Sequence, residues 1–401
     1  MGNILNIINS DEHFYNKNRN DYFMKCLTGS FYSSDLQDLF KVNSTNIGRV
    51  ENKKYIYLVE LIQENGLYLV LNNIPKKVKE LVKKEKCIII VGYESEGTLS
   101  IKSLNHWYKN NKVDYDLSKV YLLSGDLVSS GNETPVNIIK STHVVDGISF
   151  ALNKLKDNTM ELDDNFDYSF VVKKVSDIDI DSKSKHFLTF MRNCARPHRI
   201  ALASYYEYNN LWNNNISFLR AGLDTNQADF PEILDKKYFS SYKKVIDKKI
   251  VELDTKQITN KSNFNVMFSS EWKLYQETFL SVVSETIFDL DNIFISEKII
   301  KPIYNLHPFI VTSSPLFLEK LKELGFKTFS PFIDESYDLE KNHKKRMTMI
   351  FDELDKFRSK SNQELRDWWI DILPILEHNQ KTLLNFINTK TEKIKLLETL
   401  C

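Results

Sequence analysis

Residues 279–338 constrain the fold of this chain most, because strand and helix patterns alternate through them. Apolar runs at residues 279–283 and 308–312 predict two buried strands. An amphipathic helix pattern opens between them at Ser296, and Pro315 starts a further helix. This order is typical of a parallel α/β sheet. Such sheets bind ligands outside the carboxyl ends of their strands, often with an anion at a helix N-terminus. We therefore expect the chemistry at the polar residues that follow these strands.

The same alternation of patterns runs through much of the remaining chain. In the first half it predicts strands at 55–61, 67–71, 87–91 and 119–123 and helices at 74–84 and 101–108. In the second half it predicts strands at 186–190 and 216–219, helices that begin at Pro197 and Pro231, and long helices at 339–359 and 362–400. Weaker strand patterns lie at 168–172 and 264–268. The two halves therefore repeat the strand–helix alternation of a Rossmann-like domain.

This repeated alternation predicts an α/β protein of two Rossmann-like domains that face a cleft, with C-terminal helices that pack back against the domains. The charge-dense stretch 155–184 suits a connection between domains. The expected division is an irregular lead-in (1–53), an N-terminal domain (54–154), the connection (155–184), a C-terminal domain (185–375) and a C-terminal helix (376–401). A cleft between two such domains is the natural place for a ligand.

The composition narrows the possible classes of protein. With 42% hydrophobic and 12% aromatic residues, the chain has ample material for compact domains. Lys+Arg and Asp+Glu both number 54, and this neutrality argues mildly against a nucleic-acid partner. The four scattered cysteines indicate neither a zinc ribbon nor a disulfide framework. No apolar run reaches the roughly 18 residues of a membrane span. We expect a soluble, cytoplasmic protein.

One group of charged residues surrounds the predicted helix start that follows the strand at 279–283. Glu285 ends that strand, and the helix start supplies Ser296, Glu297, Lys298 and Lys301. A helix N-terminus with a lysine suits phosphates, and a carboxylate suits vicinal hydroxyls. By spacing alone the pattern is equally that of an ordinary helix start, with Ser296 as the N-cap.

A second group of charges follows the predicted strand at 186–190. Arg192, Arg196, His198 and Arg199 crowd the strand–helix junction, where arginines can neutralise a diphosphate with paired hydrogen bonds. A solvated basic helix start is the alternative. Position favours a function, because the carboxyl ends of parallel strands meet at one edge of a sheet.

The first half offers Glu94 and Glu96, which follow the predicted strand at 87–91. A carboxylate there can take the proton of an acceptor hydroxyl, although loops are rich in carboxylates anyway. Asp289 and Asp291 form a DxD in a polar loop, where Asp is expected as a turn former, so we expect no metal. The chain has no HExxH, GxSxG, Walker A or GxGxxG motif, which leaves metalloprotease, hydrolase, P-loop and classical dinucleotide functions without support.

Residues 294–298 (FISEK) are followed by a helix pattern and by the strand pattern at 307–311 (HPFIV). These blocks resemble the Tyr/Phe-x-Thr/Ser-Glu-Lys block and the next strand of the α1,3-fucosyltransferases. Glu285 resembles the glutamate before that block. Asn193 with Arg199 looks like the family's Ser-Asn…Arg segment, and Glu94 resembles its acceptor-side Glu-Ser. The blocks 325–329 and 334–338 look like those of glycosyltransferases from phages and large viruses.

This resemblance implies a GT-B fold and an inverting glycosyltransferase that uses a nucleotide sugar, with GDP-fucose as one candidate, and no metal or other cofactor. Lys298 and Arg199 would bind the diphosphate, Glu297 or Glu285 would hold the donor ribose or sugar, and Glu94 or Glu96 would be the general base. The full expected donor set is Asn193, Arg196, Arg199, Glu285, Ser296, Glu297, Lys298 and Lys301. Two alternatives stay open: a non-catalytic nucleotide- or sugar-binding module, and a phage-type transferase acting on DNA bases.

Overall fold

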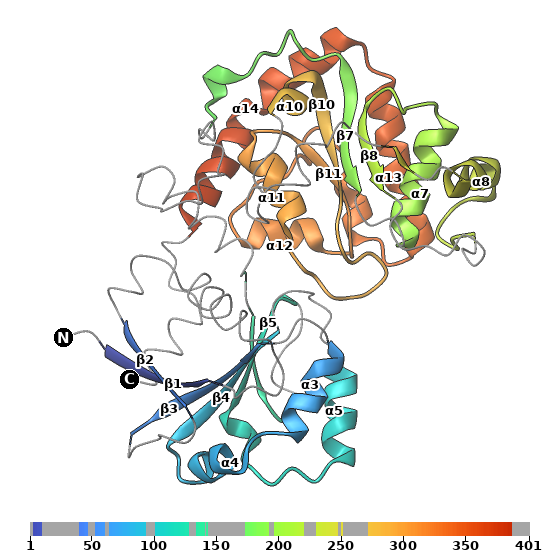
Figure 1. Cartoon of the computed structure of the whole chain (residues 1–401). Helices are drawn as coiled ribbons and strands as arrows, with labels where there is room; N and C mark the ends of the chain where they lie inside the picture. Colours follow the sequence, from blue (N-terminus) through green and yellow to red (C-terminus); the bar gives the residue numbers. More distant parts are fainter. Residues whose placement is uncertain are drawn as a thin grey trace. The chain divides into compact units, whose positions relative to one another are not determined.

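A computed structural model describes residues 3–9, 40–46, 53–60, 64–93, 101–127, 134–140, 142, 173–191, 196–219, 230–247, 250–251 and 272–386 (Figure 1). Its contacts divide the chain into two compact units. Unit 1 contains Met1–Ala151, Asn292–Phe294 and Phe386–Cys401, and unit 2 contains Leu152–Asp291 and Ile295–Asn385.

Unit 1 is built on a parallel sheet of six strands in the order β2-β1-β3-β4-β5-β6. The strands are β1 (Asn3–Asn9), β2 (Phe40–Asn46), β3 (Tyr55–Glu60), β4 (Cys87–Tyr93), β5 (Val120–Ser124) and β6 (Asn137–Lys140). Every pairing is parallel. Such a sheet needs helical crossovers, which cover its faces.

Three helices cover one face of this sheet: α3 (Glu64–Asn72), α4 (Lys76–Lys83) and α5 (Ile101–Asn110) (Figure 1). Alternate strand residues such as Tyr57, Ile89 and Leu122 share one core cluster with helix residues such as Val78 and Leu104. The period of two along the strands and the period near 3.6 along the helices bring these side chains together. The strands predicted at 55–61, 87–91 and 119–123 and the helices predicted at 74–84 and 101–108 are confirmed.

Two predictions for unit 1 are wrong. The lead-in expected to be irregular contains β1 and β2, and β1 lies between β2 and β3 in the sheet. Pairing on both sides holds this Asn-rich segment extended, which local periodicity does not reveal. Residues 67–71, predicted to be a strand, belong to α3. Leu67, Val70 and Leu71 are buried while Leu69 is 50% exposed, which is the spacing of a helix and not of a strand.

Unit 2 is built on a five-stranded sheet in the order β11-β10-β7-β8-β9. Its strands are β7 (Lys185–Met191), β8 (Asn215–Leu219), β9 (Ile250–Val251), β10 (Thr278–Ser284) and β11 (Phe309–Thr312). All are parallel except β9, which pairs antiparallel with β8. Counted from β7, the order is 5-4-1-2-3, so the chain direction across the sheet reverses between β7 and β10. This is the topological switch point at which open α/β sheets bind ligands.

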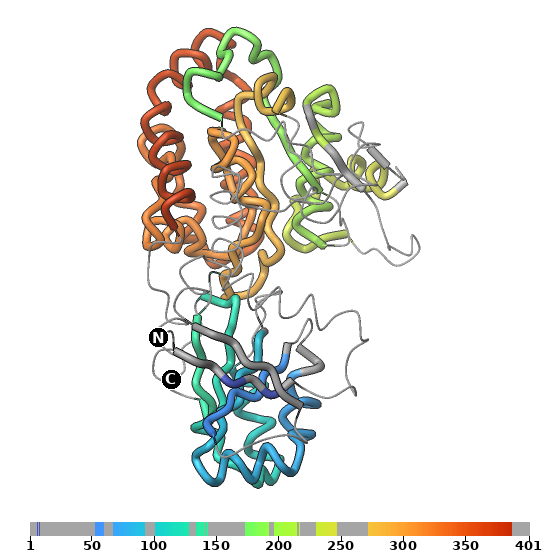
Figure 2. Tube along the Cα trace, turned by 60° about the vertical axis from the view of Figure 1, so that its left-hand side comes forward, coloured from blue at the N-terminus to red at the C-terminus, as the bar shows by residue number. Residues whose placement is uncertain are grey.

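Helices lie on both sides of this second sheet (Figure 1). They are α7 (Pro197–Tyr208), α8 (Phe239–Asp247), α10 (Trp272–Glu277), α11 (Glu297–Tyr304), α12 (Phe317–Glu323), α13 (His343–Arg358) and α14 (Asn362–Leu384). The long helix α14 lies beside α11, as Figure 2 shows from another direction. Trp369 of α14 is buried and donates to the Phe279 carbonyl at 2.8 Å, so it belongs to the core of this unit. The helix expected to begin at Pro231 begins at Phe239 instead, after a turn and a short 3-10 helix.

The α/β class with two Rossmann-like parallel sheets is therefore confirmed. The weak strand predictions at 168–172 and 264–268 lie outside the described residues. Among the helices that the structure describes, none combines the length and the apolar character that crossing a membrane requires.

Candidate active site

The candidate site lies in unit 2, at the carboxyl ends of β7 and β10, which flank the switch point. β10 is buried along its whole length and ends at Ser284, so the next residue, Glu285, emerges at the edge of the sheet. The chain returns to this edge at Ser296, where α11 begins. The first turn of α7, which follows β7, reaches the same edge through Arg196, as its hydrogen bond to Thr286 shows. Elements distant in sequence thus place their charged residues together.

Glu285 is the central side chain of this edge and is 0% exposed. Its Oε2 accepts a hydrogen bond of 2.5 Å from the Ser296 hydroxyl and a longer one of 3.3 Å from the Thr286 N–H. Its Oε1 is buried and has no hydrogen-bond partner among the described residues. Burial raises the pKa of the Glu285 carboxyl, and the charge of Lys298 and the hydrogen bond from Ser296 oppose that rise.

Ser296 links the helix start to this carboxylate. As the N-cap of α11, its Oγ accepts from the Lys298 N–H at 3.2 Å, while its hydroxyl proton is donated to Glu285. The capping pattern expected for an ordinary helix start is therefore present. It is combined with a buried carboxylate that a helix start does not require, so capping alone does not account for Glu285.

The Lys298 ammonium group lies beside Ser296 and Glu285, and the Lys298 side chain is 24% exposed. Its Nζ donates to Ser296 Oγ at 3.0 Å and to Thr286 Oγ1 at 3.1 Å. It lies 3.4 Å from Glu297 Oε1 and 3.9 Å from Glu285 Oε2. Burial alone would raise the pKa of Glu297, but the charges of Lys298 and Lys301 and hydrogen bonds from the helix start lower it. A partly exposed cation at a helix N-terminus can meet an incoming phosphate.

The first turn of α7 holds the end of β10 through its backbone carbonyls. Arg199, which is buried, donates from Nη2 to the carbonyls of Ser284 at 3.3 Å and Glu285 at 3.2 Å. Arg196 donates from Nη1 to the Thr286 carbonyl at 2.5 Å. His198 Nε2 donates to the Glu285 carbonyl at 2.9 Å, and burial lowers the pKa of this histidine to about 3, so the ring is neutral. The turn fixes the backbone that carries Glu285.

Two further side chains of unit 2 anchor the loop after β10. The Phe288 ring stacks on His198, with centroids 5.3 Å apart, and the Arg346 guanidinium lies 4.3 Å from the Phe288 centroid. Arg346 also donates to the Phe288 carbonyl. The Ile287 carbonyl accepts from the Ser314 N–H at 3.1 Å. When the hydrogen bonds from α7 are included, each backbone carbonyl of residues 284–288 accepts at least one hydrogen bond.

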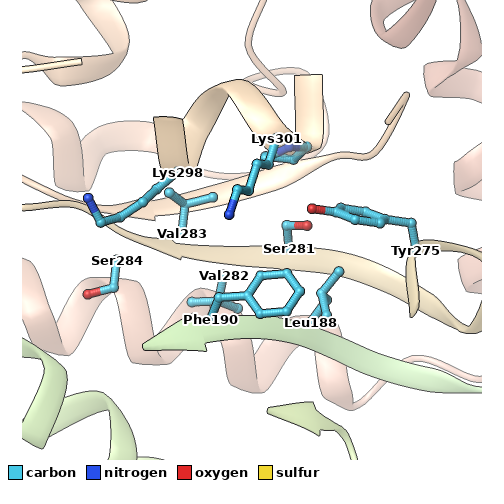
Figure 3. A pocket seen from close by; sticks show the side chains of 10 residues that line it. Leu188, Phe190, Tyr275, Ser281, Val282, Val283, Ser284, Lys298 and Lys301 are labelled. Carbon is cyan, nitrogen blue, oxygen red and sulfur yellow. The ribbon is translucent and has the colours of Figure 1, made fainter. Parts of the chain in front are cut away.

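A pocket opens beside this corner, between β7, β10 and α11 (Figure 3). The side chain of Lys301 points from α11 into it, and Lys298 lies at the end nearest Ser284 (Figure 3). Lys301 Nζ is 5.9 Å from the centroid of the Phe190 ring. Ser284 Oγ is buried and makes no hydrogen bond among the residues that the structure describes. The lining combines cationic and apolar side chains.

The structure brings together seven of the ten predicted site residues. These are Arg196, Arg199, Glu285, Ser296, Glu297, Lys298 and Lys301. The other three, Asn193, Glu94 and Glu96, lie outside the described residues, so their predicted roles stay predictions. Asp289 and Asp291 are exposed, and within the described ranges no group of His, Cys, Asp and Glu could hold a metal ion.

Sequence reasoning missed three contributors to this corner. Thr286 meets Lys298 through its hydroxyl, and its place next to Glu285 was a usable signal. Phe288 and Arg346 act through ring and backbone contacts between segments far apart in the chain, for which no local pattern exists.

The block at 334–338 has a role in folding. Asp334 caps a short 3-10 helix, and Glu335 accepts from the Phe329 N–H and the Thr328 hydroxyl, both at 2.7 Å. Asp338 accepts from the N–H groups of Leu318 at 3.0 Å and Glu319 at 3.2 Å, which caps α12. These contacts also explain the block at 325–329 to which Thr328 and Phe329 belong.

No family model and no curated protein sequence matches the chain. Solved structures resemble it at low identity. The match to an α1,3-fucosyltransferase with GDP has 10% sequence identity and a TM-score of 0.42, and it covers 97% of this chain and 92% of that transferase. The match to an α1,3-fucosyltransferase with GDP-fucose has 10% sequence identity and a TM-score of 0.40, and it covers 100% of this chain and 91% of that transferase. The match to a UDP-forming α,α-trehalose-phosphate synthase from Burkholderia xenovorans has 9% sequence identity and a TM-score of 0.40, and it covers 96% of this chain and 79% of that synthase. Structural similarity at this level carries no argument about function.

Proposed function

We propose that this chain is a glycosyltransferase of the GT-B type that moves a sugar from a nucleotide-sugar donor to a hydroxyl acceptor. The observation that carries the proposal is the Lys298 ammonium group at the N-terminus of α11, beside buried Glu285 and at the switch point of the sheet. The FISEK block of the sequence supports a fucosyltransferase-like reaction, with GDP-fucose as the first donor to test.

The departing nucleoside diphosphate is the part of this reaction that the described residues suit. Its negative charge grows as the bond to the sugar breaks, and fixed positive groups that meet this charge lower the barrier. Lys298 and the N–H groups of the first turn of α11 supply such groups without a metal. The hydrogen bonds from Ser296 and Thr286 hold the ammonium in place before the donor arrives.

The remaining roles follow from the sequence. Glu297, one third exposed at the start of α11, is the candidate for the donor hydroxyls. Glu94 or Glu96 is the candidate general base that takes the proton of the acceptor hydroxyl. Attack from the side opposite the leaving group would give the inverting outcome.

A thermal-shift panel tests donor binding. GDP-, UDP-, CMP- and dTDP-sugars are added singly to the full chain. A ligand that binds only the folded state at a hundred times its Kd stabilises it by about 2.7 kcal/mol, so the true donor raises Tm by a few degrees. If no nucleotide sugar raises Tm, the proposal is wrong. Stabilisation without transfer or donor hydrolysis identifies the non-catalytic binding module instead.

The substitution Lys298→Ala tests the residue that carries the proposal. We expect turnover to fall by roughly 100-fold or more, because charge stabilisation at the leaving diphosphate is lost. The free energy of unfolding should fall by only about 1–2 kcal/mol, because the pair with Glu297 is partly exposed and buried Glu285 can take up a proton once the charge of Lys298 is removed. Lys344→Ala, which removes an exposed lysine from α13, is the matched control. Wild-type-like turnover in Lys298→Ala would remove the basis of the proposal.

A further inference from the structure

Two carboxylates share the one ammonium group of Lys298. Glu297 Oε1 lies 3.4 Å and Glu285 Oε2 lies 3.9 Å from its Nζ. With both carboxylates ionised, the three side chains carry one net negative charge. A diphosphate that reaches Lys298 adds more negative charge beside them, and like charges disfavour each other's ionised form. The corner accommodates the anion best if one carboxylate becomes neutral.

Glu285 is the carboxylate that is suited to gain a proton. It is 0% exposed, and burial raises its pKa, whereas the pKa of the more exposed Glu297 is lowered. Its Oε1 has no hydrogen-bond partner among the described residues. A buried ionised oxygen that receives no hydrogen bond is poorly stabilised, so a proton adds most readily there.

The other charged groups around Glu285 do not compete for this role. From α7, Arg196, Arg199 and His198 direct hydrogen bonds to the carbonyls of residues 284–286. His198 is neutral near pH 7, because burial lowers its pKa to about 3. From α11, the charged groups are Glu297, Lys298 and Lys301, and β11 contributes the Thr312 carbonyl, which accepts from the Glu285 N–H at 3.1 Å.

We propose that an anion binding at Lys298 is taken up together with one proton, which adds to Oε1 of the Glu285 carboxylate. The proton comes from solvent, and no covalent bond of the anion changes. The identity of the anion, the diphosphate of a nucleotide sugar, rests on the proposed function. The consequence is that affinity falls with rising pH, by up to about tenfold per pH unit while Glu285 takes up a full proton.

Calorimetric titration in two buffers measures this proton directly. GDP-fucose and UDP-glucose are the probes, because a diphosphate diester has no proton of its own to exchange near pH 7. Each is titrated into the full chain in Tris and in PIPES at the same pH, and the difference in binding enthalpy divided by the difference in buffer ionisation enthalpy gives the protons taken up. Wild type should take up a substantial fraction of one proton at pH 7.

Matched amide variants assign the proton. Glu285→Gln, which is neutral and keeps a donor group, should bind without proton uptake and with affinity independent of pH. Glu319→Gln, which changes an exposed carboxylate on α12, is the control and should still take up the proton. Binding by wild type without proton uptake, or uptake that persists in Glu285→Gln, overturns this inference and leaves the proposed function intact. If Glu285→Gln does not fold, the wild-type result alone decides. If no nucleotide sugar binds, these two probes and the rest of the panel included, the proposed function is overturned, and the inference falls with it.

Discussion

At the scale of single residues, the corner depends on buried polar side chains more than on exposed charges. The sequence correctly predicts that Arg196 and Arg199 meet Glu285 at one edge. It does not reveal that their guanidinium groups bind backbone carbonyls there, because spacing along a helix does not distinguish a group that faces the backbone from one that faces a ligand. Arg199 therefore has a positioning role in this structure, and its role toward a diphosphate stays a prediction.

His198 gives a test of this buried arrangement through its pH dependence. Its pKa is about 3 when folded and about 6.5 when unfolded, so the unfolded chain binds more protons between these values. Its stabilising contribution is complete above pH 6.5 and is lost as pH falls toward 3. Between pH 7 and pH 5, we expect His198 to account for roughly 2 kcal/mol of lost unfolding free energy.

Urea unfolding of wild type and His198→Gln at pH 7 and pH 5 checks this expectation. Glutamine can still donate to the Glu285 carbonyl but does not titrate, so the variant should lose less stability on acidification. Buried His307, whose pKa is also lowered, remains in both proteins and contributes equally to each. Equal losses in the two proteins would contradict a buried neutral His198.

At the scale of elements, local patterns predicted most strands and helices, and the exceptions have a physical cause. Residues 64–72 are a helix because their apolar side chains face one core at helical spacing, but a short apolar run does not by itself distinguish helix from strand. β1 and β2 were missed because parallel pairing, and not local propensity, holds them extended. The cap of α12 was also hidden, since Asp338 lies in a later element.

Asp338 offers an element-scale prediction. Asp338→Ala leaves the N–H groups of Leu318 and Glu319 without their acceptor, which should cost about 1–2 kcal/mol of unfolding free energy. Asp338→Asn keeps one side-chain oxygen and should cost less. Glu319→Ala, which removes an exposed carboxylate from the same turn, serves as the control. Denaturant midpoints of the three variants test this order, and a smaller effect for Asp338→Ala than for Glu319→Ala would contradict the capping role.

At the scale of the whole molecule, alternating patterns predicted two parallel sheets but not the order of their strands. That order depends on pairings between distant segments, such as β10 with β7 and β11, and no local signal encodes it. The order nevertheless decides where the candidate site lies, because it sets the switch point between β7 and β10. The sequence thus supplied the charged residues, and the topology supplies the reason that they share one edge.

Hydrogen exchange with and without GDP tests this division of roles. All seven described site residues belong to unit 2, so a bound diphosphate should slow exchange of amides at 284–287 and 296–299 and in the first turn of α7. Amides of β3, β4 and β5 in unit 1 are the internal control and should be unchanged by GDP alone. Local opening governs exchange at such edges, so binding free energy appears there as added protection. Protection centred on unit 1 would place the diphosphate away from Lys298 and contradict the proposed site.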